Sequence, residues 1–150
     1  MNPSIKETAE LLRLKLLLGL VTVPEVIQWA DEVITAEDAP DWELIEVSLA
    51  REIQITEMMK LLTEIRGDCV RVQVYRRLFK TWLTNLSEDP AQGALIARQL
   101  YMMTSELPEN EFGSEAFSLD DSFDLVEFGY GTHAEAVQRL RDYLEKHASA

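Results

Sequence analysis

The stretch Val70-Arg71-Val72-Gln73-Val74-Tyr75 decides the fold class, because its apolar residues alternate as they do in a β-strand. A lone strand is not stable, and the sequence shows no second strand that could pair with it. Beyond Tyr75 the apolar residues return to helical spacing, at Leu78, Phe79, Trp82, Leu83 and Leu86. We therefore predict a helix through residues 70–86 and an all-α protein, which a sheet containing residues 70–74 would refute.

Local signals on both sides of this stretch mark further helices. Capping boxes, in which Ser or Thr is followed three residues later by Glu, occur at Ser4/Glu7, Thr22/Glu25 and Thr132/Glu135. Gly19 and Gly67 are placed to end helices. The pattern predicts helices from Ser4 to Gly19 and over 23–35, from Pro40 to about Arg51, over 54–66, from Asp89 to about Glu106, and from Thr132 onward, fraying at 148–150.

The apolar positions predict which side chains form the core. The first helix has little polar face after Glu10, so we expect it to be the most buried. The helix that follows Pro40 should bury Trp42, Ile45 and Leu49, with Ile53 as a further candidate. The residues expected near the centre are Leu12, Leu16, Ile27, Trp29 or Ile34, Leu49, Leu62, Leu83, Leu100 and Leu140.

Length and composition indicate one domain over residues 1–150, an irregular bundle of about six or seven helices whose antiparallel pairs could stack as in a solenoid. The formal net charge of −13 argues against binding to nucleic acid or to an anionic membrane. The longest apolar run, 11–23, contains two cations and is too short to span a bilayer.

The first residues lack a secretory signal, and Cys69 is the only cysteine, so we expect a cytoplasmic protein. Cys69 itself should be an ordinary small core residue rather than a nucleophile.

Charge is distributed unevenly along the chain. Residues 1–80 hold 10 basic and 14 acidic side chains, whereas residues 81–150 hold 4 and 13, and no Lys or Arg lies between Gln99 and Gln138. The long connection at 107–131 and its borders concentrate the acids that we take as candidate partner-binding residues: Glu106, Glu109, Glu111, Glu115, Asp120, Asp121, Asp124 and Glu127. Such a cluster attracts basic partners and speeds their association.

The same connection also contains apolar residues that need burial, and we predict a short helix at about 119–128 within it. Its apolar side chains should hold it on the helical body while the carboxylates project outward as an ordered ridge. These apolar residues are Phe112, Phe117, Leu119, Phe123, Leu125, Phe128 and Tyr130.

Other interpretations of these charges stay open. The acids could form a solvated face that only aids solubility. A metal site is less favoured, because residues 120–124 lack the spacing and the glycine of a calcium loop, and His133 and His147 are too far apart on one helix to share an ion. The basic group Arg66, Arg71, Arg76, Arg77 and Lys80 does not form a single stripe, so we expect it to neutralise acids on neighbouring helices rather than to bind phosphate. Catalytic signatures and cofactor motifs are absent, so the sequence predicts no catalytic residue, no metal and no cofactor.

Two segments resemble small helical bacterial proteins, some of which are encoded beside polymorphic toxins as immunity proteins. The first comprises Gly19-Leu20-Val21-Thr22, then Trp29-Ala30-Asp31 and 40–49. The second runs from Phe123-Asp124-Leu125 through Gly129-Tyr130-Gly131-Thr132 to Leu144. The resemblance implies a bacterial, cytoplasmic, non-enzymatic binder whose acidic surface covers a basic toxin, and it carries over no catalytic residue.

The sequence therefore predicts a protein-binding domain that takes a basic protein partner. The alternative is an adaptor or scaffold subunit that binds its partner through an apolar helix groove. An enzyme of unidentified type is the least favoured interpretation.

Overall fold

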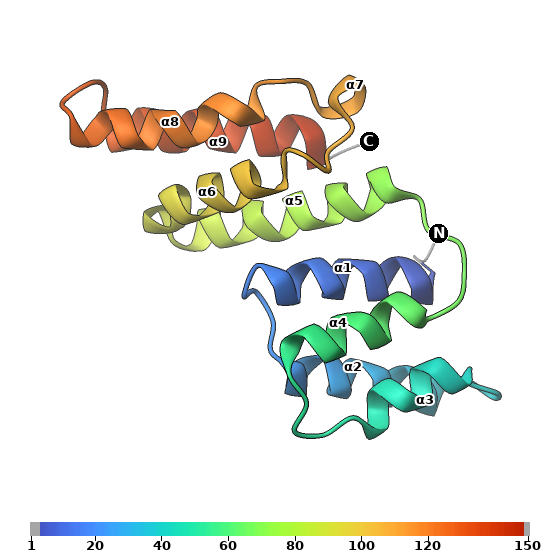
Figure 1. Cartoon of the computed structure of the whole chain (residues 1–150). Coiled ribbons are helices and arrows are strands. Elements are labelled where there is room, and N and C mark those ends of the chain that lie inside the picture. Colours follow the sequence, from blue (N-terminus) through green and yellow to red (C-terminus); the bar gives the residue numbers. More distant parts are fainter. Residues whose placement is uncertain (1–3, 149–150) are drawn as a thin grey trace. The chain divides into compact units, whose positions relative to one another are not determined.

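The computed structural model describes residues 4–148, apart from the side chains at 109 and 110, and within this part of the chain it contains helices and no strand (Figure 1). The stretch at 70–75 lies at the start of a helix, so the all-α prediction is confirmed. The described residues contain more helices than the six or seven expected. They are α1 (Ile5–Leu17), α2 (Val23–Ala36), α3 (Trp42–Leu49), α4 (Ile55–Glu64), α5 (Arg71–Glu88), the 3-10 turn η1 (Pro90–Gln92), α6 (Gly93–Met103), α7 (Glu109–Phe112), α8 (Ala116–Glu127) and α9 (His133–Ala148).

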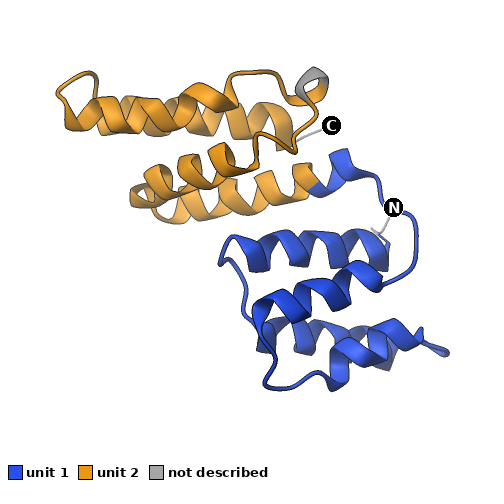
Figure 2. Cartoon of the chain, viewed as in Figure 1, with its two compact units in different colours: residues 1–74 blue, residues 75–150 orange. Residues whose placement is uncertain are grey.

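The chain divides into two compact units, residues 1–74 and 75–150 (Figure 2). The division falls inside α5, close to its start, where the sequence has no linker composition. Each unit is described by itself below. The assignment of residues 1–150 to one domain stays a prediction.

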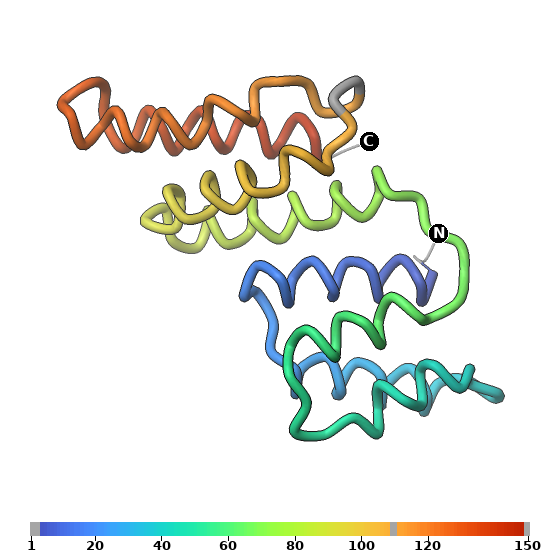
Figure 3. The backbone as a smooth tube through the Cα atoms, viewed as in Figure 1, coloured from blue at the N-terminus to red at the C-terminus, as the bar shows by residue number. Residues whose placement is uncertain are grey.

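In the first unit, α1 packs against α4, α2 packs against α3, and α3 also contacts α4 (Figure 3). The predicted caps at its first two helices form: the Ser4 hydroxyl accepts a hydrogen bond from the Glu7 amide, and the Thr22 hydroxyl accepts one from the Glu25 amide. A cluster of buried side chains lies between these helices. Its members are Ala9, Leu16, Val26, Ala30, Leu44, Val47, Met58, Leu62 and Ile65.

The predicted buried stripe of α3 is wrong. Leu44 and Val47 are buried, whereas Trp42 and Leu49 are 62% and 67% exposed. This short helix has apolar residues on more than one side, and its contacts with α2 and α4 determine which side is covered.

The expectation that the first helix is the most buried is also wrong. Four of the 13 residues of α1 are buried, against six of the 11 residues of α6. Neighbouring helices cover only part of the leucine-rich surface of α1, and Leu17 is half exposed. Among the predicted central residues, Leu16, Leu62, Leu100 and Leu140 are buried, Leu12, Ile27, Trp29, Ile34 and Leu83 are partly buried, and Leu49 is exposed.

In the second unit, α6 packs against both α8 and α9, and α8 packs against α9. The centre is aromatic: Phe79 lies 5.7 Å from Trp82 and 5.2 Å from Phe112 between ring centroids. The Trp82 indole donates a hydrogen bond of 3.0 Å to the side-chain carbonyl of the buried Gln99. These buried rings set the positions of the helices that carry the acidic residues.

The connection at 107–131 is more helical than predicted. Besides α7, it contains α8, which begins at Ala116 rather than near residue 119. Phe112, Leu119 and Phe123 are buried and fix both helices in the second unit. The helix α8 ends at Glu127 with Phe128 as its C-cap, and Gly129 then takes a φ of 85°, a conformation that costs glycine little. None of the described helices is long and apolar enough to span a membrane.

Candidate protein-binding surface

The outer side of α8 combines apolar and acidic side chains in one stripe. This stripe consists of Phe117, Asp121, Asp124, Leu125 and Phe128. Successive members lie one, three or four residues apart, which places them on one side of a helix. All five are exposed to solvent, and Phe128 is 77% exposed. We call these five residues the α8 outer stripe. The opposite side of α8 is buried through Ala116, Leu119, Asp120 and Phe123.

The predicted burial of the apolar residues in this segment is only partly right. Phe112, Leu119 and Phe123 are buried, but Phe117, Leu125, Phe128 and Tyr130 are about half exposed or more. One helix can bury only one side, and α8 has apolar residues on both. A helical projection of residues 116–128 would have revealed the second apolar side from sequence.

Asp120 does not project outward as predicted. It is buried, with 7% of its surface exposed, and its carboxylate accepts a hydrogen bond of 3.2 Å from Nε of Arg98 on α6. A buried carboxylate requires such a partner, because losing water without compensation is costly. Asp120 therefore holds α8 against α6 and is unavailable to a partner protein.

Arg98 also affects the neighbouring acids. Its Nη2 atom lies 3.9 Å from the Asp124 carboxylate. Carboxylate oxygens of Asp120, Asp121 and Asp124 lie within 4.8 Å of one another. Because the guanidinium contacts two of these three acids, the protein itself supplies a cation that reduces their mutual repulsion. Asp121 is exposed and makes no ion pair within the described residues.

The remaining predicted acids lie on several elements of the second unit. Glu106 follows α6, Glu115 precedes α8 and Glu127 ends it, and all three are exposed. Glu111 on α7 lies 3.7 Å from Arg76. The side chain of Glu109 lies outside the described residues. The structure therefore brings the carboxylates of Asp120, Asp121 and Asp124 together on α8. Glu127 is the last residue of the same helix, and the other candidates lie outside α8 in the chain.

A buried aromatic cluster holds α7 in place against α5 and α9. The ring of Phe112 contacts Tyr75, Phe79 and the imidazole of His147, and Arg76 lies over it at 5.6 Å. The Tyr143 hydroxyl donates a hydrogen bond of 3.2 Å to the Phe112 carbonyl.

Burial has opposite effects on the two titratable rings of this cluster. It raises the pKa of Tyr143, and the carboxylate of Glu115 adds to this rise. Burial lowers the pKa of His147, as do the nearby cations Lys146 and Arg76. Both rings are therefore neutral at pH 7, as an apolar environment favours.

Arg66 and Arg76, two of the basic residues of the middle segment, pair with acids of other helices. Nε of Arg66 lies 2.8 Å from the Glu43 carboxylate. The pKa of Glu43 is lowered mainly by a backbone hydrogen bond and, to a smaller extent, by this arginine. Arg76 pairs with Glu111 and also donates a hydrogen bond of 3.0 Å to the carbonyl of His147. The expectation that these cations neutralise acids of other helices is confirmed for Arg66 and Arg76.

Cys69 is only half buried, in the link between α4 and α5, and so is not the core residue we expected. The adjacent Val70 is 62% exposed, because the helix that was to bury it begins one residue later. Partial burial is the main cause that raises the pKa of the Cys69 thiol, and the negative charges of Glu10 and Glu7 raise it further. A raised pKa keeps the thiol protonated and weakly nucleophilic.

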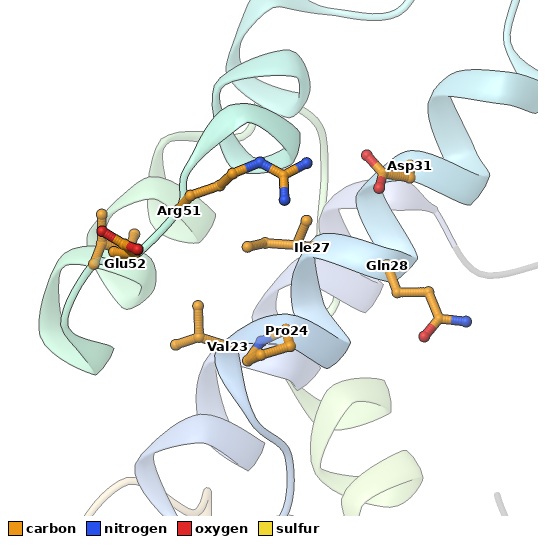
Figure 4. A pocket seen from close by; sticks show the side chains of 8 residues that line it. Val23, Pro24, Ile27, Gln28, Asp31, Arg51 and Glu52 are labelled. Atoms are coloured by element: carbon orange, nitrogen blue, oxygen red, sulfur yellow. The ribbon is translucent and has the colours of Figure 1, made fainter.

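A second surface feature, missed from the sequence, lies in the first unit. An open groove of about 600 Å³ runs between the first turns of α2 and residues 51–53, which lead into α4 (Figure 4). Val23, Pro24, Ile27 and Ile53 make its apolar lining, and Gln28, Asp31, Arg51 and Glu52 complete it. The sequence signal was Ile53, which we considered only as a buried extension of α3.

Comparison of the chain with protein families, with curated proteins and with solved structures finds no match.

Proposed function

We propose that the chain is a non-enzymatic protein-binding domain that covers a basic partner protein with the α8 outer stripe. The observation that carries this proposal is the exposure of Phe117, Leu125 and Phe128 on the same side of α8 as Asp121 and Asp124. Large apolar side chains that are grouped on a surface commonly mark an interaction site.

The two kinds of side chain have different tasks in such an interface. Aromatic residues provide most of the binding energy when a partner buries them, and a single such residue is often worth about 2 kcal/mol or more. Exposed acids contribute less affinity, but they steer a basic partner and reject an acidic one. Arg98 pairs with Asp120 and Asp124. Asp121 and Glu127 have no counter-ion among the described residues, so their charge is available to a partner.

The most specific form of this proposal is a bacterial immunity protein that acts in the cytoplasm on a basic toxin. It draws on the resemblance of 19–49 and 123–144 to small helical bacterial proteins, and on the charge of the second half of the chain, with 13 acidic and 4 basic residues over 81–150. Covering an active site requires shape and charge complementarity, and requires no chemistry from the inhibitor.

The proposal is tested by affinity capture from the native host, followed by identification of the retained protein. The tagged parent chain should retain a basic protein, and retention should weaken steeply between 50 and 500 mM salt. The double variant Phe117→Ser/Phe128→Ser should lose it. As a matched control, the variant Trp42→Ser removes an exposed aromatic residue from the first unit. This variant should still retain the basic protein. Equal retention by the parent and the double variant would contradict the proposal.

The groove in the first unit favours a second candidate function, that of an adaptor or scaffold subunit. Its lining is mainly apolar, and its size is within the range of common ligand-binding clefts, about 300–1,000 Å³. For this candidate the charge of α8 would be incidental, and affinity would depend little on salt.

A further inference from the structure

We infer that the groove between α2 and residues 51–53 binds one amphipathic helix whose polar positions are basic. This inference rests on the second candidate function and names the chemistry of its partner. It is independent of the α8 outer stripe, which lies in the other unit.

The shape of the surface suits a helix. The groove is open rather than enclosed, and a second hollow of about 280 Å³, lined by Ile53, Glu57, Lys60, Leu61 and Glu64, continues from it along α4. The two hollows share Ile53, so apolar side chains extend from Val23 and Ile27 past Ile53 to Leu61. A partner helix uses such a track by inserting apolar residues spaced three and four positions apart.

The groove is formed before any partner arrives. The backbone at Glu52 has a φ of 57°, which is uncommon for a residue with a side chain and is strained. This conformation directs Ile53 back to the core, against which it packs. The Ser48 hydroxyl donates a hydrogen bond to the Asp31 carboxylate, which ties α3 to α2 beside the groove. Strain that the fold maintains at a surface groove is typical of a binding site.

The charges around the two hollows select the partner. Four exposed acids, Asp31, Glu52, Glu57 and Glu64, stand against two exposed cations, Arg51 and Lys60. Within the described residues, Glu52, Glu57 and Glu64 form no ion pair. Residues 1–74 hold 14 acidic and 7 basic residues, so the surrounding field is negative as well. A helix with lysine or arginine beside its apolar stripe complements this surface, whereas an acidic helix is repelled.

The test uses three synthetic peptides of about 14 residues with leucine at three-and-four spacing and lysine, glutamine or glutamate at all other positions. Affinity for the full chain is measured by titration calorimetry, and the site is located by methyl NMR. The lysine peptide should bind most tightly, and it should shift the methyl signals of Val23, Ile27, Ile53 and Leu61.

Two matched charge reversals locate the charge effect. Glu52→Lys/Glu57→Lys should weaken binding of the lysine peptide about tenfold, which corresponds to about 1.4 kcal/mol. Glu88→Lys/Asp142→Lys makes the same change in net charge on the second unit, away from the α8 outer stripe, and should alter affinity less than twofold. All four positions are exposed, so neither variant removes a core contact.

Four results would overturn the inference. Methyl shifts confined to residues 75–150, or equal weakening by the two reversals, would show that the lysine peptide binds elsewhere or through overall charge. Equal affinity for the glutamine peptide at the same methyl groups would refute the basic partner but leave the adaptor function standing. Failure of all three peptides to bind would refute the groove as a docking site.

Discussion

Replacement of Gly93 by alanine tests how closely α6 packs against α8 and α9. Gly93 is buried at the start of α6 in an ordinary helical conformation. A Cβ atom added there would lie 2.9 Å from Cζ of Phe123 and 3.1 Å from Cγ2 of Val137. Carbon atoms in good contact are about 3.5–4.0 Å apart, so the side chains of Phe123 on α8 and Val137 on α9 would have to shift.

Two opposing effects determine the result for Gly93→Ala. Alanine in a helix is favoured over glycine by about 0.5–1 kcal/mol. Overpacking of a closely packed core costs roughly 1–3 kcal/mol. We expect the steric cost to dominate, so that the free energy of unfolding falls by about 1–2 kcal/mol.

The assay is urea unfolding followed by the fluorescence of the buried Trp82, in a background with Trp29→Phe and Trp42→Phe. Phe123→Leu should relieve the clash, so the double variant with Gly93→Ala should be more stable than the sum of the two single changes predicts, by about 1 kcal/mol. Thr84→Ala, an exposed helical control, should stabilise by a few tenths of a kcal/mol. Stabilisation by Gly93→Ala, or strict additivity with Phe123→Leu, would show that the close contact does not exist.

Four further changes have defined outcomes. Phe112→Ala should lower the free energy of unfolding by about 3–5 kcal/mol and remove the hydrogen-exchange protection of α7, because its ring joins that helix to Phe79 and His147; unchanged protection would contradict this role. Because the pKa of His147 is lowered in the folded state, the unfolded state binds more protons below about pH 6.5, so stability should fall from pH 7 to pH 5. His147→Gln should reduce this loss of stability, as measured by urea unfolding at both pH values. An equal loss in the variant would show that His147 does not cause it. Arg98→Met should cost about 1–2 kcal/mol in thermal or urea unfolding, since it leaves the carboxylate of Asp120 buried without its partner; an unchanged midpoint would show that Asp120 reaches water. Leu16→Ala should cost about 2–5 kcal/mol in the unfolding of residues 1–74, and a smaller loss would place Leu16 outside the core.

The sequence by itself determined where the capped helices begin, because capping signals are local. The hydroxyls of Ser4, Thr22 and Thr132 each accept the hydrogen bond from the backbone amide three residues later, as their capping boxes predict. Gly19, with a φ of 74°, directly follows the C-cap of α1 as predicted. The prediction for Gly67 is wrong, because α4 ends at Glu64 with Ile65 as its C-cap. Helical spacing after Tyr75, together with the lack of a partner strand, was sufficient to predict the helix that the structure shows over Arg71–Glu88.

Only the tertiary structure decided which side of each helix is buried and which acids are free. Trp42, Phe117 and Phe128 are as apolar as the residues that fill the core, but neighbouring helices cover the other sides of α3 and α8. Arg98 lies 22 positions before Asp120 in the sequence, and it reaches that carboxylate only because α6 packs against α8. The physical reason is that capping depends on residues three or four positions apart, whereas burial and ion pairing depend on helices that are distant in the sequence and meet only in the folded chain.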